Sequence, residues 1–334
     1  MLMKMVFPLT LIWIISRNSN YLCGRVINNQ FRAPVSIELP SIQPLPILQD
    51  LAYLQKPKAL DVLHLEKIHP TISGNKWFKL KYNIAEAETQ GFRSLLSCGG
   101  PHSNHLHALA CAGAAFDIKT FGLVRGYENL PLTPTLIDCQ RMGMTLIFVD
   151  KKTYQQRYDL AWCQQQSEQY DSYWIPEGGN NDLGHQGCAE LAKYCQGYDE
   201  IWLSIGSGST FLGLADGLRH LAAVNAGEPP IIKGVLAIKG GDDLASDLLS
   251  KVFEPHRIDT EGHLGGFGKC PSALVARIKA YDEQGLALDP VYTGKLIVAF
   301  EQSWQANLLD MSKRYLIIHT GGLQGRRGIA ELAD

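Results

Sequence analysis

Three short segments contain the residue types and spacings that suit chemistry. The first is Ser73-Gly74-Asn75-Lys76, where a lysine follows a flexible turn and begins a stretch with helical periodicity. The positive end of a helix dipole disfavours a charged amine, and burial lowers the pKa of a lysine further. A neutral lysine of this kind forms covalent bonds with carbonyl carbons. The alternative is an exposed lysine in the first turn of a surface helix.

The second segment runs from Cys98 to His105, between an apolar run and an alanine-rich helix. Gly99 and Gly100 allow a ligand to approach the backbone closely. Ser103 and Asn104 then place hydrogen-bond donors at a helix N-terminus, where a carboxylate binds well. One alternative is a turn with a serine cap and no ligand. Another is a metal site, built from His102, His105 and His107, but no carboxylate lies nearby in the sequence to complete it, so we predict no metal.

The third segment is Gly206-Ser207-Gly208-Ser209-Thr210, which follows an apolar run and precedes a helical stretch. Backbone amides and hydroxyls at such a turn bind phosphate, helped by the helix dipole. The segment lacks the lysine of a nucleotide-binding P-loop, and Phe211 stands where a dinucleotide-binding loop requires glycine. The composition therefore favours a phosphate monoester over ATP or NAD.

These segments must be positioned by strands and helices that alternate along the chain. Apolar runs predict strands, and helical stretches separate them, including a helix over Thr135–Met142 with Thr133 as N-cap and Pro134 in its first turn. The predicted strands are Ser94–Cys98, Thr120–Val124, Thr145–Val149, Ile201–Ile205, Ile231–Ile238 and Tyr315–Ile318. Such alternation predicts an α/β fold with two mostly parallel, twisted sheets and helices on both faces.

Composition excludes several classes of protein. The 334 residues have a formal net charge of −2, which gives no basic field for nucleic acid or an anionic membrane. The eight cysteines are scattered and favour reduced thiols in a cytoplasmic protein over a disulfide framework. The apolar segment from Met5 to Ile15 is too short for a membrane-spanning helix, and no clear cleavage site follows it. We interpret residues 1–34 as a leader outside the fold, with a secretory signal as the alternative.

The ordered motifs resemble the family of 1-aminocyclopropane-1-carboxylate deaminase and D-cysteine desulfhydrase. This family belongs to the tryptophan-synthase-β type of pyridoxal 5'-phosphate (PLP) enzymes, or fold type II. The resemblance runs from about Leu39 to the C-terminus and rests on the segments 73–76, 103–105, 206–210, 263–269, 289–295 and 319–322. It implies a larger PLP-binding domain from residues 35–85 and 186–334, and a smaller α/β domain from residues 86–185.

The resemblance also implies roles for individual residues. Lys76 would carry PLP covalently and later act as the base for the α-proton, and Ser103 would bind the substrate carboxylate or assist proton transfer. Asn104 would bond the phenolic oxygen of PLP, and the loop Gly206, Ser207, Gly208, Ser209 and Thr210 would hold its phosphate. Tyr292 would lie against the ring and Thr320 would meet the ring nitrogen. Substrate contacts are expected from Ser103, Asn104, His105 and Tyr292.

The expected substrate depends on positions at which this chain differs from the family. Cyclopropane deaminases carry Glu where this chain has Thr293 and Leu where it has Thr320. Both departures favour α,β-elimination from a small amino acid, as in D-cysteine desulfhydrase, with 1-aminocyclopropane-1-carboxylate deaminase as the alternative. Phe78 replaces a common arginine, and Leu65-Glu66-Lys67-Ile68 replaces a common Arg-Asp-Asp-Leu. These changes leave open a PLP-binding protein with little turnover. The resemblance further implies a homodimer.

Overall fold

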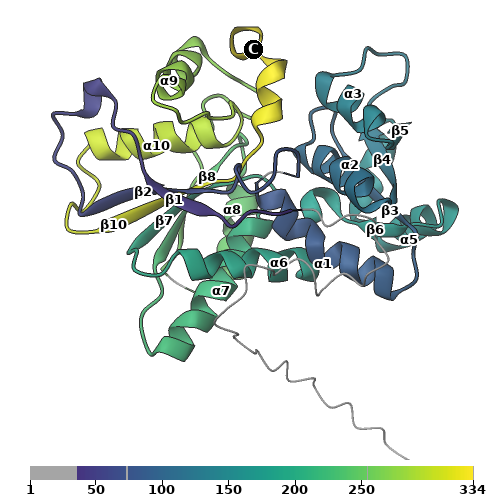
Figure 1. The fold of residues 1–334 in the computed structure, drawn as a ribbon, viewed down its shortest axis with the longest axis horizontal. Helices are drawn as coiled ribbons and strands as arrows, with labels where there is room; N and C mark the ends of the chain where they lie inside the picture. Colours follow the sequence, from purple (N-terminus) through teal and green to yellow (C-terminus); the bar gives the residue numbers. More distant parts are fainter. Residues whose placement is uncertain (1–35, 73, 254, 334) are drawn as a thin grey trace, which may run out of the picture.

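The computed structural model describes residues 36–72, 74–253 and 255–333. The predicted leader therefore lies outside the described residues. The described chain forms two sheets with helices packed around them, and Figure 1 shows the two sheets side by side. None of the helices in these ranges is long and apolar enough to cross a membrane.

The larger sheet has six strands in the order β1-β2-β10-β7-β8-β9, and only the edge strand β1 runs antiparallel to its neighbour. Its strands are β1 (Ser41–Pro44), β2 (Ala59–His64), β7 (Glu200–Ile205), β8 (Ile231–Leu236), β9 (Arg257–Asp259) and β10 (Arg314–His319). Its helices are α7 (Ser209–Asn225), α8 (Asp242–Ser250), α9 (Ser272–Asp282) and α10 (Thr293–Gln305).

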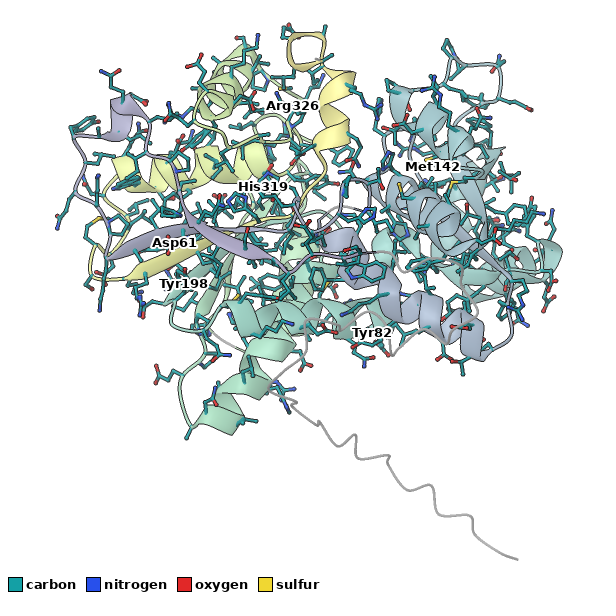
Figure 2. The ribbon with its side chains drawn as sticks, in the orientation of Figure 1. Asp61, Tyr82, Met142, Tyr198, His319 and Arg326 are labelled. Carbon is teal, nitrogen blue, oxygen red and sulfur yellow. The ribbon has the colours of Figure 1, made fainter. Side chains whose placement is uncertain are left out.

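Both faces of the larger sheet are buried. Successive side chains of a strand point to opposite faces, so Ile201 and Leu203 join one apolar cluster with α7 while Trp202 joins another with α9 and α10. The strands are accordingly apolar throughout, as expected for a parallel sheet covered on both sides. Tyr198, just before β7, donates a hydrogen bond to Asp61 of β2 at 2.8 Å and ties neighbouring parts of the sheet together (Figure 2).

The smaller sheet is entirely parallel and has the strand order β5-β4-β3-β6. Its strands are β3 (Ser94–Gly99), β4 (Lys119–Arg125), β5 (Thr145–Val149) and β6 (Tyr173–Ile175). The helices within this part of the chain are α2 (Asn104–Phe116), α3 (Pro134–Arg141), α4 (Lys151–Gln155) and α5 (Leu160–Gln169).

Two helices join the sheets. Helix α1 (Asn75–Thr89) leads from the larger sheet into the smaller one, and α6 (Asp182–Ala189) leads back. The two helices pack directly on each other (Figure 1). A Cβ atom at Gly187 would lie only 1.7 Å from the carbonyl oxygen of Phe78, so this approach requires glycine. The chain thus leaves the larger sheet and re-enters it at one place.

The predicted fold class is confirmed, and the predicted strands match β3, β4, β5, β7, β8 and β10 to within two residues at each end. The Thr133 cap of α3 is also confirmed, because its hydroxyl accepts the amide hydrogen of Leu136 at 3.3 Å. The strands β1, β2, β6 and β9 were not predicted. Two of them have only three residues, which is too short to show a periodic pattern.

Candidate active site

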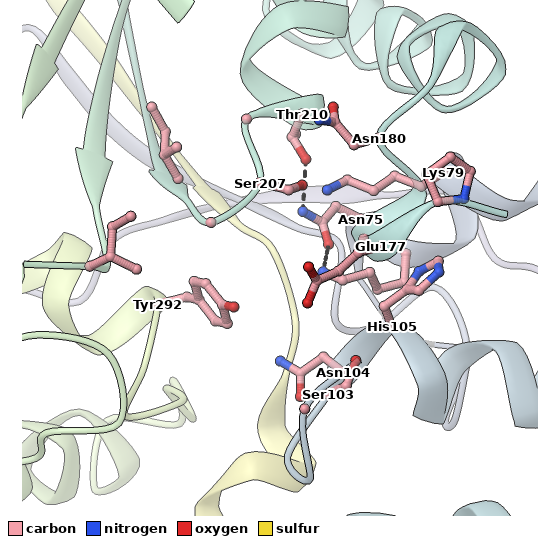
Figure 3. A pocket seen from close by; sticks show the side chains of 18 of the residues that line it. Asn75, Lys79, Ser103, Asn104, His105, Glu177, Asn180, Ser207, Thr210 and Tyr292 are labelled. Carbon is pink, nitrogen blue, oxygen red and sulfur yellow. Dashed lines mark hydrogen bonds between the residues drawn. The ribbon is translucent and has the colours of Figure 1, made fainter. Parts of the chain in front are cut away.

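A cavity of about 890 Å³ lies where the carboxyl ends of strands from both sheets face each other. Ligands of parallel α/β folds bind at these strand ends, beyond the sheet edge. Ten of the eleven predicted site residues line the cavity, among them Ser103, Asn104 and Tyr292 (Figure 3), and the eleventh, Ser209, is the first residue of α7. The sequence motifs, which are separated by up to about 240 residues, therefore meet in one place.

Lys76 lies in the first turn of α1. Gly74 precedes the helix with a φ of 72°, and a Cβ atom there would lie 2.0 Å from the carbonyl oxygen of Thr320. Only glycine accommodates both the dihedral angle and this close approach. The same carbonyl accepts the amide hydrogen of Asn75 at 3.1 Å. The start of α1 is thus fixed to the end of β10, which sets the direction of the Lys76 side chain.

The Lys76 amine is hydrogen-bonded to the side chain of the preceding residue, Asn75. Its Nζ donates to Asn75 Oδ1 at 2.7 Å, and Asn75 Nδ2 donates to Thr210 Oγ1 at 2.8 Å (Figure 3). Burial, and next the charge of Lys79, lower the pKa of Lys76 to about 7, while Cys188 and Asp289 oppose this shift. A large fraction of the amine is therefore neutral near pH 7 and able to attack a carbonyl carbon.

Lys79, one turn after Lys76 and the alternative lysine for covalent attachment, also lines the cavity. It is buried, and burial lowers the pKa of its amine. Within the described residues no carboxylate pairs with it and no hydrogen bond is made by its amine. Figure 3 shows its side chain pointing toward Ser207 and Thr210. A buried cation directed at a loop of amides and hydroxyls is suited to bind an anion.

The loop Gly206–Thr210 joins β7 to α7. Gly208 has a φ of 86°, and a Cβ atom there would lie 2.4 Å from Leu248 Cδ2. Ser207 Oγ lies 3.2 Å from Ser209 Oγ, which also donates to Asn180 Oδ1 at 3.0 Å. The loop therefore presents hydroxyls and the amides of a helix N-terminus to the cavity, which is the donor set that binds phosphate.

Ser103 caps α2, because its Oγ accepts the amide hydrogen of Leu106 at 3.2 Å. The hydroxyl keeps its own hydrogen for donation, so the capping and the carboxylate-binding interpretations are compatible. Asn104 Oδ1 accepts from Gln324 Nε2 at 2.8 Å, which fixes the amide at the cavity wall. The cavity wall here combines a helix N-terminus with two side-chain donors.

His105 is buried, and its Nε2 lies 2.9 Å from Ser97 Oγ. Burial, then the charges of Lys76 and Lys79, lower its pKa to about 3, so the ring is neutral. Its Nδ1 is buried without a hydrogen-bond partner among the described residues. His107 instead faces Asp138, with Nε2 3.3 Å from Oδ2. The two histidines thus have separate partners.

Tyr292 and Thr320 form the wall of the cavity nearest the larger sheet. A Cβ atom at Gly206 would lie 3.0 Å from the Tyr292 ring, so glycine permits this ring to lie against the loop. Burial raises the pKa of Tyr292, which keeps the phenol protonated. Thr320 is buried, and its Oγ1 lies 3.2 Å from Ser204 Oγ. The cavity therefore offers an aromatic face and neutral hydroxyls here.

Glu177 is the only acidic side chain among the described residues that line the cavity. It follows β6 and accepts hydrogen bonds from Tyr154 Oη at 2.5 Å and from Arg157 Nε at 2.6 Å. This group was not predicted from the sequence, because the three-residue strand before it is too short to show a periodic pattern. The available signal was the Pro176-Glu177-Gly178-Gly179 turn after an apolar run.

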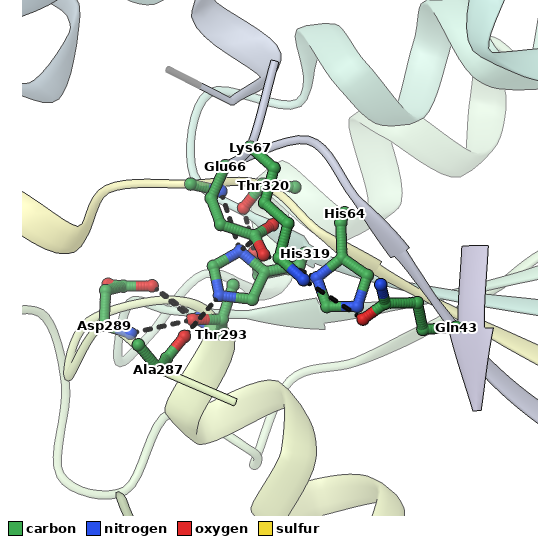
Figure 4. Close-up of polar contacts among 11 residues, drawn as sticks. Gln43, His64, Glu66, Lys67, Ala287, Asp289, Thr293, His319 and Thr320 are labelled. Atoms are coloured by element: carbon green, nitrogen blue, oxygen red, sulfur yellow. Dashed lines mark hydrogen bonds and ion pairs between the residues drawn. The ribbon is translucent and has the colours of Figure 1, made fainter. Parts of the chain in front are cut away.

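A polar network lies behind Thr320 and contains the altered segment 65–68. Glu66 is buried, with Oε1 2.5 Å from His64 Nδ1 and Oε2 3.1 Å from His319 Nδ1 (Figure 4). His319 Nε2 also lies 2.7 Å from the carbonyl oxygen of Ala287. Burial raises the pKa of Glu66, but the His64 hydrogen bond and the charges of both histidines outweigh it and lower the pKa. The network fixes the strand end that carries Thr320.

Comparison with known proteins gives consistent results. The family model described as pyridoxal-phosphate dependent enzyme matches residues 42–321. A Thermotoga maritima protein, provisionally named a 1-aminocyclopropane-1-carboxylate deaminase, is 27% identical over 274 residues, or 76% of this chain and 85% of the relative. A D-cysteine desulfhydrase of Salmonella schwarzengrund is 28% identical over 281 residues, or 75% and 83%. These relatives confirm the resemblance that the motifs indicated.

Solved structures support the fold. A crystal structure of a homologue of 1-aminocyclopropane-1-carboxylate deaminase has a TM-score of 0.71 at 23% identity and covers 90% of this chain and 94% of its own. The processed form of threonine deaminase isoform 2 from Solanum lycopersicum has a TM-score of 0.59 at 15% identity and covers 87% and 82%. These two structures share the fold, and the family match over residues 42–321, which spans most of the chain, shows that the chain belongs to the family of pyridoxal-phosphate dependent enzymes.

Proposed function

We propose that this enzyme catalyses α,β-elimination from a small amino acid, with D-cysteine as substrate. One D-cysteine and one water would give pyruvate, ammonia and hydrogen sulfide. The observation that carries the proposal is the state of Lys76: its amine is held inside the cavity by Asn75, and its pKa is lowered to about 7. Such an amine suits both covalent attachment of PLP and proton transfer near neutral pH.

The residues of the cavity fit PLP. The Lys76 amine would bond the aldehyde carbon, and the loop Gly206–Thr210 together with Lys79 would hold the phosphate. The support is the donor set described above and the buried Lys79 amine, which has no partner within the described residues. Asn104, Tyr292 and Thr320 would meet the phenolic oxygen, the ring face and the ring nitrogen. When bound, PLP supplies the electron sink for the charge that develops after the α-proton leaves.

The remaining residues would position the substrate and move its proton. The N-terminus of α2, with the Ser103 hydroxyl, would bind the α-carboxylate. His105 would stay neutral, as its lowered pKa requires, and would offer hydrogen bonds without competing for the proton. Once released from the cofactor, Lys76 Nζ would take the α-proton, because its lowered pKa allows an unprotonated amine at pH 7. Thr320 would keep a neutral partner at the ring nitrogen.

The position of Thr320, but not that of Thr293, favours elimination over opening of a cyclopropane ring. Thr320 lines the cavity, where a cyclopropane deaminase is expected to have leucine. Thr293 exchanges hydrogen bonds with Asp289, at 2.7 Å from Oγ1 to Oδ1, and does not line the cavity. Phe78 is also buried away from the cavity. We further propose a homodimer, as the resemblance implies, and a cytoplasmic location, which the scattered cysteines favour.

The test uses purified holoprotein with D-cysteine and assays sulfide and pyruvate. Borohydride reduction followed by peptide mapping should label Lys76. The variant Lys76→Ala should lose both product formation and the label, whereas Lys81→Ala, on the same helix but outside the cavity, should keep both. Labelling of Lys79 would show that the wrong lysine was assigned. Formation of 2-oxobutanoate from 1-aminocyclopropane-1-carboxylate, with no sulfide from D-cysteine, would favour the deaminase, and bound cofactor without any product would favour a binding protein.

A further inference from the structure

The charge of the cavity exceeds what PLP and a simple amino acid require. Four basic side chains line it, those of Lys76, Lys79, Arg125 and Arg157, and Glu177 is the single carboxylate among the described residues of the lining. Arg157 is already neutralised, because its Nε donates to Glu177 Oε2 at 2.6 Å and its guanidinium lies over the rings of Tyr154 and Tyr158. Arg125 is exposed to solvent, and it is the cation of the cavity that neither the proposed function nor Glu177 accounts for.

Arg125 is the last residue of β4, at the ligand-binding edge of the smaller sheet. Its guanidinium lies 5.8 Å from the centre of the Tyr154 ring. One of its terminal nitrogens would lie 3.9 Å from a Cβ atom at Gly100, in the turn that leads to Ser103. The amide of Ser103 donates to the carbonyl of Gly100 at 3.0 Å, so Arg125 lies beside the turn that would bind the substrate carboxylate.

No acidic side chain in the described ranges pairs with Arg125, and no hydrogen bond holds its guanidinium. In the proposed function, Lys79 and the Gly206–Thr210 loop serve the phosphate, and the α2 N-terminus serves the α-carboxylate. Arg125 is then left for a third anion. The cavity has room for one, since about 890 Å³ is near the upper end of the 300–1,000 Å³ that is typical of small-molecule sites.

We propose that Arg125 binds an anionic group on the side chain of the substrate, so that, beside D-cysteine, the enzyme accepts amino acids with a carboxylate, sulfonate or phosphate at the β-carbon and binds them more tightly than uncharged analogues of the same shape. A guanidinium suits such groups because it donates two parallel hydrogen bonds to their oxygens. The proposal rests on the elimination activity proposed above and specifies its substrate class. With O-phosphoserine, for example, one substrate and one water give pyruvate, ammonia and phosphate.

Binding without turnover provides the first test. Aspartate and asparagine have nearly the same shape, differ by one side-chain charge and lack a good leaving group. Their affinities for the holoprotein, measured from the change in cofactor absorption for both enantiomers, should favour aspartate by at least tenfold. In Arg125→Gln this preference should disappear, because aspartate loses affinity while asparagine keeps it. Arg125→Lys should restore part of it.

Two controls make the result specific. Arg141→Gln removes the same charge at the exposed end of α3, outside the cavity, and should leave the preference unchanged. Pyruvate formation should then fall at least tenfold in Arg125→Gln with O-phosphoserine and less than threefold with D-cysteine. Equal affinity of the wild-type holoprotein for aspartate and asparagine would overturn the proposal. An equal loss of both ligands in Arg125→Gln would also overturn it, because Arg125 would then serve the α-carboxylate.

The measurements distinguish failure of the Arg125 proposal from failure of the proposed elimination activity. If neither D-cysteine nor O-phosphoserine gives pyruvate but aspartate is still preferred through Arg125, the elimination activity is wrong and the anion site stands. If D-cysteine gives pyruvate and no charge preference exists, the elimination activity stands and the anion site is wrong.

Discussion

The Lys76 amine donates to the Asn75 side chain at 2.7 Å, and through Asn75 it is coupled to Thr210 in the phosphate-binding loop. Two adjacent residues thus link the group that would bond the aldehyde of PLP with the loop that would hold its phosphate, although the two segments are more than 130 residues apart.

The lowered pKa of Lys76 predicts a pH dependence of stability in the cofactor-free protein. The pKa is about 7 in the folded state and near the ordinary value of 10.5 in the unfolded state. Between these values the unfolded state binds more protons, so the free energy of unfolding rises with pH across this window. Relative to Lys76→Met, the wild-type apoprotein should gain on the order of 1 kcal/mol per pH unit from about pH 7 to pH 10. Denaturant unfolding at fixed pH values measures this, and a constant difference between the two proteins would contradict it.

Removal of the Ser103 hydroxyl should affect turnover more than cofactor binding. Ser103→Ala loses a donor at the α2 N-terminus, and we expect at least a tenfold loss of kcat/KM with PLP affinity changed less than threefold. The lost cap costs about 1 kcal/mol of stability. Asp159→Ala removes the cap of α5, which is outside the cavity, and controls for that loss. If Ser103→Ala loses cofactor and activity in parallel, Ser103 is structural.

A methyl group at Gly208 should weaken cofactor binding. Ala at φ of 86° is strained by about 1–2 kcal/mol, and its Cβ would lie 2.4 Å from Leu248 Cδ2. We expect the Kd for PLP to rise at least tenfold in Gly208→Ala, measured by titration of apoprotein. Gly227→Ala is a suitable control, because a Cβ atom there meets nothing within 4 Å and its φ is not positive. An unchanged Kd in Gly208→Ala would mean that the loop does not hold the phosphate.

Glu66 should stabilise the folded protein at neutral pH and not at acidic pH. Its pKa is lowered in the folded state, so its contribution is present above the ordinary carboxyl pKa of 4.5 and is lost as pH falls through the folded-state value. Glu66→Gln leaves two buried histidines without their carboxylate, and we expect a loss of about 3 kcal/mol at pH 7. The exposed Glu283→Gln should lose less than about 0.5 kcal/mol. Thermal unfolding from pH 3 to pH 8 would reveal a gap between wild type and Glu66→Gln that closes in acid.

The motifs predicted much of the site, because the residue composition of each motif is enough to predict its local structure and the kind of group that it binds. A glycine–hydroxyl turn at the start of a helix, or a lysine after a glycine turn, has a recognisable composition wherever the chain places it. The groups of the smaller sheet differ in this respect. Arg125 and Glu177 lie beside the cavity only because of the strand order β5-β4-β3-β6, which places the ends of β4 and β6 on either side of β3. No local pattern encodes that order.

The Glu66 network illustrates the same limit. Its departure from the common Arg-Asp-Asp-Leu segment was visible in the sequence, but its two histidines lie at the ends of β2 and β10, more than 250 residues apart. They meet because these strands pair in parallel, with His64 opposite His319. A long-range register of this kind follows from the packing of the whole sheet, which a single sequence does not reveal.

The packing of α1 against α6 has a consequence for how such an enzyme can diversify. The two helices pack against each other at Gly187, so the two ends of the stretch between them lie close together (Figure 1). This stretch contains the whole smaller sheet, and with it Arg125, Ser103 and Glu177. The Gly206–Thr210 loop and Thr320 lie outside it. Mutations in the stretch between α1 and α6 can therefore alter which molecule is selected while Lys76 and the phosphate-binding loop, which lie outside it, stay unchanged.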